Sequence, residues 1–178
     1  MCKKVILPRL TLVLGGAASG KSRFAESLAT ASKLPRSYIA TAQAFDDEMR
    51  EKIAKHQQDR GEGWHTTEAP LNLCQALQSQ PPNNVVLIDC LTLWLSNLLM
   101  AQKNISENSE NLLAAVTEFG GPVICVSNET GLGVIPDTPL GRRFRNAQGQ
   151  LNQDIAARAD LVVLVTAGIP LALKGQLP

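Results

Sequence analysis

The segment that most constrains the fold of this chain is a glycine-rich loop that directly follows an apolar run. Residues 10–14 read LTLVL, and the loop after them consists of Gly15, Gly16, Ala17, Ala18, Ser19, Gly20, Lys21 and Ser22. This order matches the pattern G-x-x-x-x-G-K-[ST] of a P-loop, in which a buried strand leads into a helix. The glycines let successive backbone N–H groups point at one anion, and the helix N-terminus adds its own N–H groups and dipole. The sequence therefore predicts a phosphate-binding loop.

Two side chains of this loop and one distant carboxylate suit magnesium–nucleotide chemistry. In such a loop Lys21 would reach the β- and γ-phosphates, and Ser22 would ligate Mg²⁺. Asp89 ends the apolar run VVLID at 85–89, where a P-loop protein places a carboxylate near the metal. The alternative for Asp89 is an ordinary strand-end aspartate that starts a turn. Ser22 and Asp89 are the predicted metal ligands.

Five apolar runs without polar alternation indicate buried parallel strands, and helix-like segments separate them. The predicted strands are 10–14, 37–41, 85–89, 123–127 and 161–165. The predicted helices are 20–33, 46–58, 70–79, 91–118 with a polar break near 104–108, and 139–158. This order predicts an α/β, doubly wound, mostly parallel sheet flanked by helices. The tail GIPLALKG, at 168–175, adds a candidate edge strand.

Composition excludes several classes of protein. The 178 residues include 44% hydrophobic and 19% charged side chains, which is typical of a soluble globular protein, and we predict one domain over 1–178. A formal net charge of +1 gives no reason to expect nucleic acid as a partner. The longest apolar segment, 91–101, is too short to span a membrane, and the apolar stretch near the N-terminus is too short for a signal peptide.

The cysteines point to a reducing compartment. They are Cys2, Cys74, Cys90 and Cys125. None of them forms a C-x-x-C pair, so the sequence predicts neither a zinc site nor a redox dithiol. We expect a reduced, cytoplasmic protein.

Motifs narrow the kind of phosphate chemistry. The Asn-Lys-x-Asp guanine motif of switch GTPases is absent, since the nearest segment, VSNET at 126–130, lacks the lysine and the aspartate. The size fits a small P-loop kinase better than a motor or repair ATPase. The segment GRRFR supplies Arg142, Arg143 and Arg145, which are candidates to clamp the transferred phosphoryl group. A solvated basic helix face is the alternative for these arginines.

Several further segments, read together, resemble one known family. They are GGAASGKSRFAE, YIATAQAFDDEMREKIAKHQQDR, WHTTEAP, VSNETGLGVIP and RRFRNAQGQLNQDIAARADLVVLVTAGIPLALKG. In this order they resemble the bifunctional adenosylcobinamide kinases/adenosylcobinamide-phosphate guanylyltransferases of cobalamin biosynthesis. The His-x3-Arg of KHQQDR, the SNE-x-G-x-G segment and the G-x-x-N-Q segment are far more specific than the P-loop, which many families share.

The resemblance implies a fold and a two-step reaction. It implies a RecA-like P-loop fold and an oligomeric protein, so we expect a homo-oligomer. The first step moves a phosphoryl group from ATP or GTP, with Mg²⁺, to the aminopropanol hydroxyl of adenosylcobinamide. The second moves GMP from GTP onto that phosphate through a GMP–histidine intermediate, which gives adenosyl-GDP-cobinamide and pyrophosphate.

The resemblance also assigns site residues. His56 matches the guanylylated histidine and, with Lys21, is a predicted catalytic residue, whereas His65, the only other histidine, does not match. Lys55 stands where some members have a second histidine, and Ala18 stands where an arginine is familiar. Predicted nucleotide contacts outside the P-loop are Ala40, Thr41, Ala42, Gln57, Gln58, Asp59, Arg60, Glu68 and Asp89.

Two other functions remain open at this stage. One is a plain P-loop small-molecule kinase in which His56 has no nucleophilic role. The other is a non-catalytic nucleotide-binding protein, and the presence of Lys21, Ser22, Asp89 and His56 together argues against it. Spacing alone does not separate the two-step transferase from the plain kinase.

Overall fold

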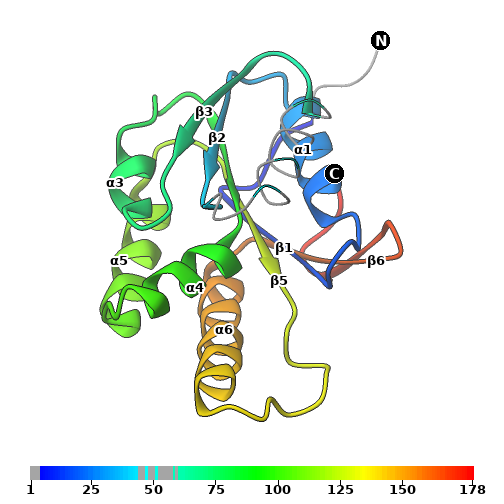
Figure 1. Cartoon of the computed structure of the whole chain (residues 1–178). Helices are drawn as coiled ribbons and strands as arrows, with labels where there is room; N and C mark the ends of the chain where they lie inside the picture. The colour runs from blue at the N-terminus through cyan, green and yellow to red at the C-terminus, as the bar shows by residue number, and fades with distance from the viewer. Residues whose placement is uncertain (1–4, 44–46, 48–50, 52–57, 59) are drawn as a thin grey trace.

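The computed structural model describes residues 5–43, 47, 51, 58 and 60–178, which form a sheet with helices on both faces (Figure 1). The strands are β1 (Leu10–Gly15), β2 (Arg36–Ala40), β3 (Trp64–Glu68), β4 (Val85–Asp89), β5 (Val123–Asn128), β6 (Leu161–Thr166) and β7 (Ile169–Lys174). The helices are α1 (Lys21–Ala31), α3 (Leu73–Gln78), α4 (Leu91–Met100), α5 (Ile105–Glu118) and α6 (Pro139–Arg158).

The strand order places the ends of several strands beside the P-loop. Within the described residues the sheet has the order β3-β2-β4-β5-β1-β6-β7. The first six strands are parallel, and β7 runs antiparallel to β6. Because parallel strands end at the same edge, the carboxyl ends of β1, β2, β3, β4 and β5 lie there together. β5 lies between the P-loop strand β1 and the strand β4 that carries Asp89.

The core explains why the strands lack polar alternation. Successive side chains of a strand point to opposite faces of a sheet. In β1, Leu12 belongs to the cluster packed against α3, α4, α5 and α6, whereas Val13 belongs to the cluster packed against α1. Both residues are fully buried. The predicted α/β class is therefore confirmed, and each of the five predicted strands is found with its ends shifted by at most one residue.

Strand β3 was not predicted. Its sequence WHTTE has no apolar pattern, because the side chains of His65, Thr66 and Glu68 are exposed and need not be apolar. It forms because its backbone pairs with β2 from Arg36 opposite Trp64 onward. The predicted edge strand at 168–175 is confirmed as β7.

The helices differ from the predictions mainly at their ends. The segment 91–118 is two helices, and α5 begins after Asn104, whose side-chain oxygen accepts from the backbone N–H of Glu107 at 3.2 Å. The break comes slightly before the predicted position because this cap starts the new helix. Helices α1 and α3 are shorter than predicted. The predicted helix 46–58 falls mostly outside the described residues. Among the described helices, none is both long and apolar enough to cross a membrane.

Candidate active site

The P-loop is packed tightly against the turn between β6 and β7. Gly20, at the start of α1, has a φ of 91°, a conformation that favours glycine. A Cβ on Gly20 would lie 3.2 Å from Cα of Gly168, and one on Gly15 would lie 2.6 Å from the carbonyl oxygen of Val165. The backbone N–H of Gly168 donates to the carbonyl oxygen of Ser19 at 2.8 Å. Larger residues at Gly15 and Gly20 would push the loop off this turn.

The start of α1 offers backbone donors to an anion. The first helical hydrogen bond runs from the N–H of Phe24 to the carbonyl oxygen of Gly20 at 3.0 Å. The N–H groups of Lys21, Ser22 and Arg23 therefore have no partner within the helix. Together with the positive end of the helix dipole, they suit a phosphate group.

Side chains of the loop reinforce this preference. Nζ of Lys21 donates to the carbonyl oxygen of Gly16 at 3.1 Å, so the ammonium group folds over the loop. Oγ of Ser19 is buried and has no hydrogen-bond partner within the described part of the chain. Gly16, Ala17 and Ala18 are exposed, so the loop is open to a ligand. Ala18 has a φ of 54°, so the loop adopts left-handed backbone there even without a glycine.

The carboxylate of Asp89 lies at the same edge of the sheet. Asp89 pairs with Ala40 of β2, and Ala40 in turn pairs with Glu68 of β3. These three predicted nucleotide contacts therefore form a row across the strand ends. The hydroxyl of Tyr38 donates to Oδ2 of Asp89 at 3.2 Å.

The buried thiol of Cys90 lies within reach of the charges of both Asp89 and Lys21. Burial, with a contribution from the Asp89 charge, raises the pKa of the Cys90 thiol to about 11, and the Lys21 charge opposes the shift. The thiol is therefore protonated at neutral pH, which excludes it as a thiolate nucleophile. Burial likewise raises the pKa of Cys125, in the core, to about 12.

Thr41, a predicted nucleotide contact, joins the turns that follow β2 and β4. Its hydroxyl donates to the carbonyl oxygen of Cys90 at 2.7 Å and accepts from the N–H of Cys90 at 2.8 Å. The side-chain amide of Asn97 donates to the carbonyl oxygen of Thr41 at 2.8 Å. Thr41 is fully buried, so in this structure its side chain stabilises the frame of the site.

Arg60 packs on an aromatic pair that sequence reasoning missed. Its guanidinium carbon lies 3.5 Å from the ring centroid of Tyr38 and 5.7 Å from that of Trp64. Nη2 of Arg60 donates to Oγ1 of Thr66 at 3.2 Å. Tyr38 belongs to the YIAT segment, which the sequence analysis had singled out. The hydrogen bond from Tyr38 to Asp89 could not be predicted, because it depends on β2 and β4 being neighbours in the sheet.

A second missed group is a buried polar network between β5 and α6. Nε2 of Gln148 donates to Oγ of Ser127 at 2.8 Å and to Oδ1 of Asn152 at 3.0 Å. Ser127 also donates to Oδ1 of Asn152 at 2.7 Å, and Asn152 donates to the carbonyl oxygen of Asn128 at 3.1 Å. The network joins two of the specific motifs, the SNE segment at the end of β5 and the G-x-x-N-Q segment in α6. It also adjoins the P-loop strand, because Asn128 pairs with Gly15 of β1.

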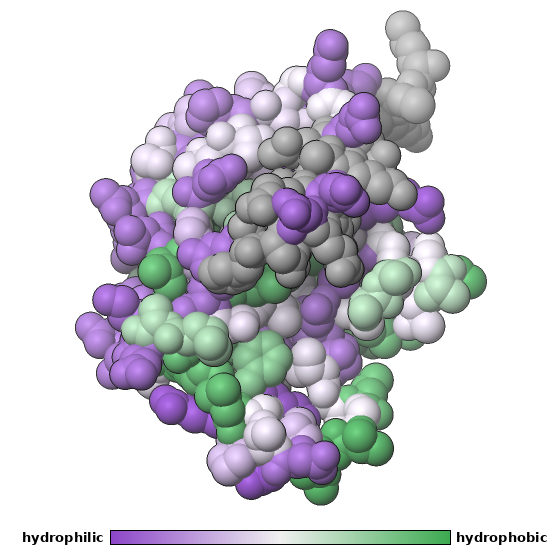
Figure 2. Space-filling view, in the orientation of Figure 1, coloured by the Kyte–Doolittle hydropathy of each residue, from purple (hydrophilic) through white to green (hydrophobic). Residues whose placement is uncertain are grey.

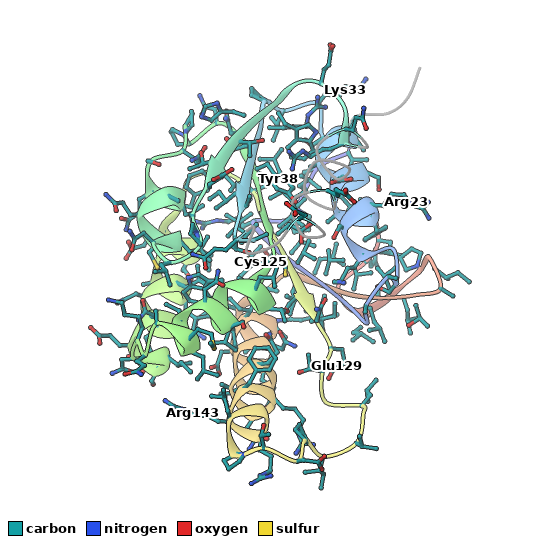
Figure 3. The ribbon with its side chains drawn as sticks, viewed as in Figure 1. Arg23, Lys33, Tyr38, Cys125, Glu129 and Arg143 are labelled. Atoms are coloured by element: carbon teal, nitrogen blue, oxygen red, sulfur yellow. The ribbon has the colours of Figure 1, made fainter. Side chains whose placement is uncertain are left out.

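The arginines of GRRFR are not gathered on one site. Nη1 of Arg142 donates to the carbonyl oxygens of Pro136 and Asp137, at 3.0 and 2.8 Å, and so closes the turn before α6. Arg143 is exposed and lies on the side of α6 away from Glu129 (Figure 3). Arg145 is half-buried.

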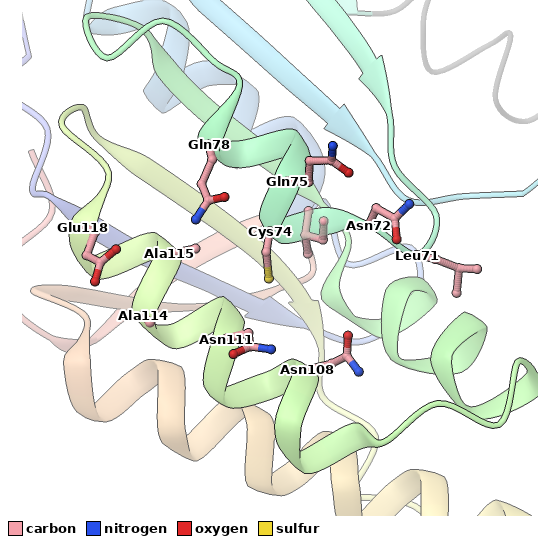
Figure 4. A pocket seen from close by; sticks show the side chains of 11 residues that line it. Leu71, Asn72, Cys74, Gln75, Gln78, Asn108, Asn111, Ala114, Ala115 and Glu118 are labelled. Atoms are coloured by element: carbon pink, nitrogen blue, oxygen red, sulfur yellow. The ribbon is translucent and has the colours of Figure 1, made fainter.

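Two surface grooves adjoin α3. One, of about 360 Å³, lies between α3 and α5 and is lined by amide side chains such as Asn72, Gln75 and Asn111 (Figure 4). The other, of about 400 Å³, begins at Glu68. Lys21 lines neither of these two grooves.

The remaining predicted residues differ in how far the structure describes them. Ala42 is half-buried, and Gln58 and His65 are exposed. His56, Gln57 and Asp59 lie outside the described residues. The proposed roles of all these residues stay predictions.

The predicted magnesium ligands fit that ion in their chemistry. Ser22 supplies a hydroxyl at the start of α1, and Asp89 a carboxylate at the same sheet edge. Among the described residues no group of three or more His, Cys, Asp or Glu side chains could hold a metal. Mg²⁺ in nucleotide sites is commonly bound by one or two protein ligands together with phosphates and water, so this sparse donor set suits it.

Solved structures share the fold at low sequence identity. The flagellar accessory protein FlaH from Methanocaldococcus jannaschii aligns with a TM-score of 0.57 and 14% identity, over 96% of this chain and 80% of that one. The RadB recombinase aligns with a TM-score of 0.50 and 18% identity, over 89% of this chain and 74% of that one. These similarities confirm a RecA-like P-loop fold.

Sequence relatives are much more similar. The bifunctional adenosylcobalamin biosynthesis protein CobP of Pseudomonas aeruginosa is 49% identical over 168 residues, which are 93% of this chain and 97% of the relative. The bifunctional adenosylcobalamin biosynthesis protein CobU of Escherichia coli is 38% identical over 181 aligned positions, which are 93% of this chain and 99% of the relative. Residues 11–173, from the P-loop strand to β7, match the family described as cobinamide kinase / cobinamide phosphate guanyltransferase, and the chain therefore belongs to that family of bifunctional enzymes.

Proposed function

We propose that this chain phosphorylates the aminopropanol hydroxyl of adenosylcobinamide, with ATP or GTP as donor, and then transfers GMP from GTP onto the new phosphate. The products of the second step are adenosyl-GDP-cobinamide and pyrophosphate. The observation that carries the proposal is the family match over residues 11–173, which includes both the P-loop and the KHQQDR segment.

In the kinase step the chain's own groups hold the triphosphate. The first-turn N–H groups of α1 and the ammonium group of Lys21 bind the β- and γ-phosphates, while Ser22 and Asp89 hold the magnesium ion. When bound, Mg²⁺ neutralises charge on the phosphate oxygens. The substrate hydroxyl oxygen then bonds to the γ-phosphorus as the bond to the β–γ bridging oxygen breaks; the nucleoside diphosphate leaves, and the hydroxyl proton is released to solvent.

In the guanylyl step His56 is the nucleophile. A neutral imidazole nitrogen attacks the α-phosphorus of GTP, pyrophosphate leaves, and a phosphate oxygen of the second substrate then displaces the imidazole. The position of Arg60 supports this assignment, because its guanidinium stacks on Tyr38, which is hydrogen-bonded to Asp89.

The test is formation of the covalent intermediate. The protein is incubated with α-labelled GTP and Mg²⁺, and its mass is measured. We expect a gain of one GMP, in a bond that acid cleaves and alkali does not, at His56 by peptide mapping. Addition of adenosylcobinamide phosphate is expected to discharge the label. A protein that phosphorylates adenosylcobinamide but forms no adduct would be a plain kinase, and an adduct at Lys55 or Lys21 would refute the assignment of His56.

We propose further that the chain associates with copies of itself. Apolar side chains gather at the lower right over the loop between β5 and α6, and at the right over β7 (Figure 2). Leu132, Val134 and Ile135 are 88%, 92% and 67% exposed, and Ile169 on β7 is 70% exposed. Exposed apolar residues grouped in this way suit a protein interface. Light scattering on the purified protein measures the mass that decides this proposal.

We also propose a cytoplasmic location. Cys74, Cys90 and Cys125 are free thiols in the structure. Free thiols suit a reducing compartment, since disulfides form and persist mainly in oxidising ones. Fractionation of cells that express the tagged protein tests this location.

A further inference from the structure

Tyr38 holds the carboxylate of Asp89 from the neighbouring strand. It is the only tyrosine of the chain. It lies in β2 (Figure 3) and is 7% exposed, and its hydroxyl donates to Oδ2 of Asp89 at 3.2 Å. Asp89 ends β4 and is itself only half-buried. A hydrogen bond from a buried, rigid ring to one carboxylate oxygen limits rotation of that carboxylate and leaves its other oxygen for a different partner.

The ring of Tyr38 also holds Arg60. The guanidinium carbon of Arg60 lies 3.5 Å from the ring centroid, which is close contact for a cation over an aromatic face. The ring of Trp64 meets that of Tyr38 edge-on, at 6.0 Å between centroids and an interplanar angle of 90°. The two contacts fix the ring in place. Tyr38 therefore connects the end of β4 to the last residue of the His-x3-Arg segment.

We propose that Tyr38 is a positioning residue for both reaction steps. Its hydroxyl orients the Asp89 carboxylate for the magnesium–nucleotide complex, and its ring face orients Arg60, the last residue of the His-x3-Arg motif. The inference rests on the proposed function, because it takes the roles of Asp89 and His56 from there.

The hydroxyl and the ring are tested by different variants. Tyr38→Phe removes the hydroxyl and keeps the ring, so it isolates the bond to Asp89. Ser37→Ala is the matched control: Ser37 is buried on the same strand, and its hydroxyl accepts a hydrogen bond from Asn84 at 2.8 Å, away from Asp89. Both variants lose one partly buried hydrogen bond, so both are expected to melt at a lower temperature.

The decisive measurement for the hydroxyl is metal affinity. Mn²⁺ binding in the presence of GDP is followed by electron paramagnetic resonance, and Mg²⁺ is titrated in the kinase assay. Loss of a hydrogen bond to a charged group is expected to raise the half-saturating metal concentration about three- to tenfold in Tyr38→Phe. We expect kcat at saturating Mg²⁺ within about twofold of wild type, and Ser37→Ala to follow the wild-type titration. A Tyr38→Phe titration that superimposes on wild type overturns the inference.

The ring is tested through the covalent intermediate. At saturating Mg²⁺, Tyr38→Phe is expected to form the GMP adduct at close to the wild-type rate, while Tyr38→Leu forms it at least about tenfold more slowly because Arg60 loses its stacking surface. Slow adduct formation by Tyr38→Phe, or adduct formation at the wild-type rate by a folded Tyr38→Leu protein, contradicts the proposed role of the ring. The Mn²⁺ experiment needs no corrinoid, so failure of the wild type to phosphorylate adenosylcobinamide would refute the proposed function and leave the Tyr38–Asp89 result interpretable.

Discussion

The two halves of the sheet edge that carries the site are built in different ways. The half at β1 and β5 consists of backbone groups of the P-loop and the buried network of Ser127, Gln148 and Asn152. The half at β2 and β3 consists of side chains, chiefly those of Tyr38 and Arg60, beside an exposed edge strand. The phosphate-binding part of the first half is one contiguous loop, and the buried network supports the strand beside it, whereas the second half has no such loop and depends on single side chains.

This difference reflects the two chemical tasks. Holding a triphosphate requires convergent N–H groups and a cation, which one short loop at a helix N-terminus supplies. Transferring GMP through a covalent intermediate requires a nucleophile and oriented side chains, which no single backbone conformation supplies. If this comparison is correct, loss of the nucleophile will remove guanylyl transfer and spare the kinase step, whereas loss of a phosphate-binding group will slow the kinase step and, if one P-loop serves both steps, guanylyl transfer as well.

The largest expected effect is the loss of guanylyl transfer in His56→Ala. Without the imidazole no covalent intermediate forms, so adduct and GDP-cobinamide product should fall below detection, whereas the kinase step should keep much of its rate because it needs no nucleophile on the protein. Both products are quantified by chromatography. His65→Ala, at the exposed histidine of β3, is the control and should form the adduct normally. Equal loss of both steps in a folded His56→Ala protein would break the comparison.

The next effect is expected for Lys21→Ala. Loss of the ammonium group that binds the β- and γ-phosphates should slow the kinase step about a thousandfold, while circular dichroism stays unchanged. Lys103→Ala removes an exposed lysine elsewhere and is the control. Guanylyl transfer should fall as well if one P-loop serves both steps. Kinase turnover near the wild-type rate would refute the P-loop assignment itself.

The smallest expected effect concerns stability and not chemistry. Gln148→Leu removes the amide that donates to Ser127 and Asn152, so it should lower the free energy of unfolding by about 1–3 kcal/mol and the melting temperature by several degrees. Gln150→Leu is the matched control on the same helix, because Gln150 is exposed and its amide bonds only to Asp154 within the described contacts. Calorimetry measures both. Equal melting temperatures for the two variants would mean that the buried network contributes little.

Local sequence patterns were sufficient to predict structural features that lie within one continuous stretch of the chain. The P-loop, the five buried strands and the position of Asp89 at a strand end follow from spacing and apolar runs, and the structure has each of them. The strand β3 could not be found in this way, since its exposed side chains carry no periodic signal. The break between α4 and α5 was expected near its true position because polar residues interrupt the apolar segment there, and the structure shows that Asn104 caps α5.

By itself, the sequence determined the phosphate loop, the α/β class and, through its specific motifs, the family. Only the tertiary structure decided that Tyr38 meets Asp89 and carries Arg60, and that Gln148 and Asn152 reach Ser127. The reason is physical. A loop conformation or a buried strand depends on residues a few positions apart, whereas these contacts depend on β2 pairing with β4 and on α6 packing beneath β5. The packing of the whole core selects that order of strands. No local sequence pattern specifies which strand pairs with which.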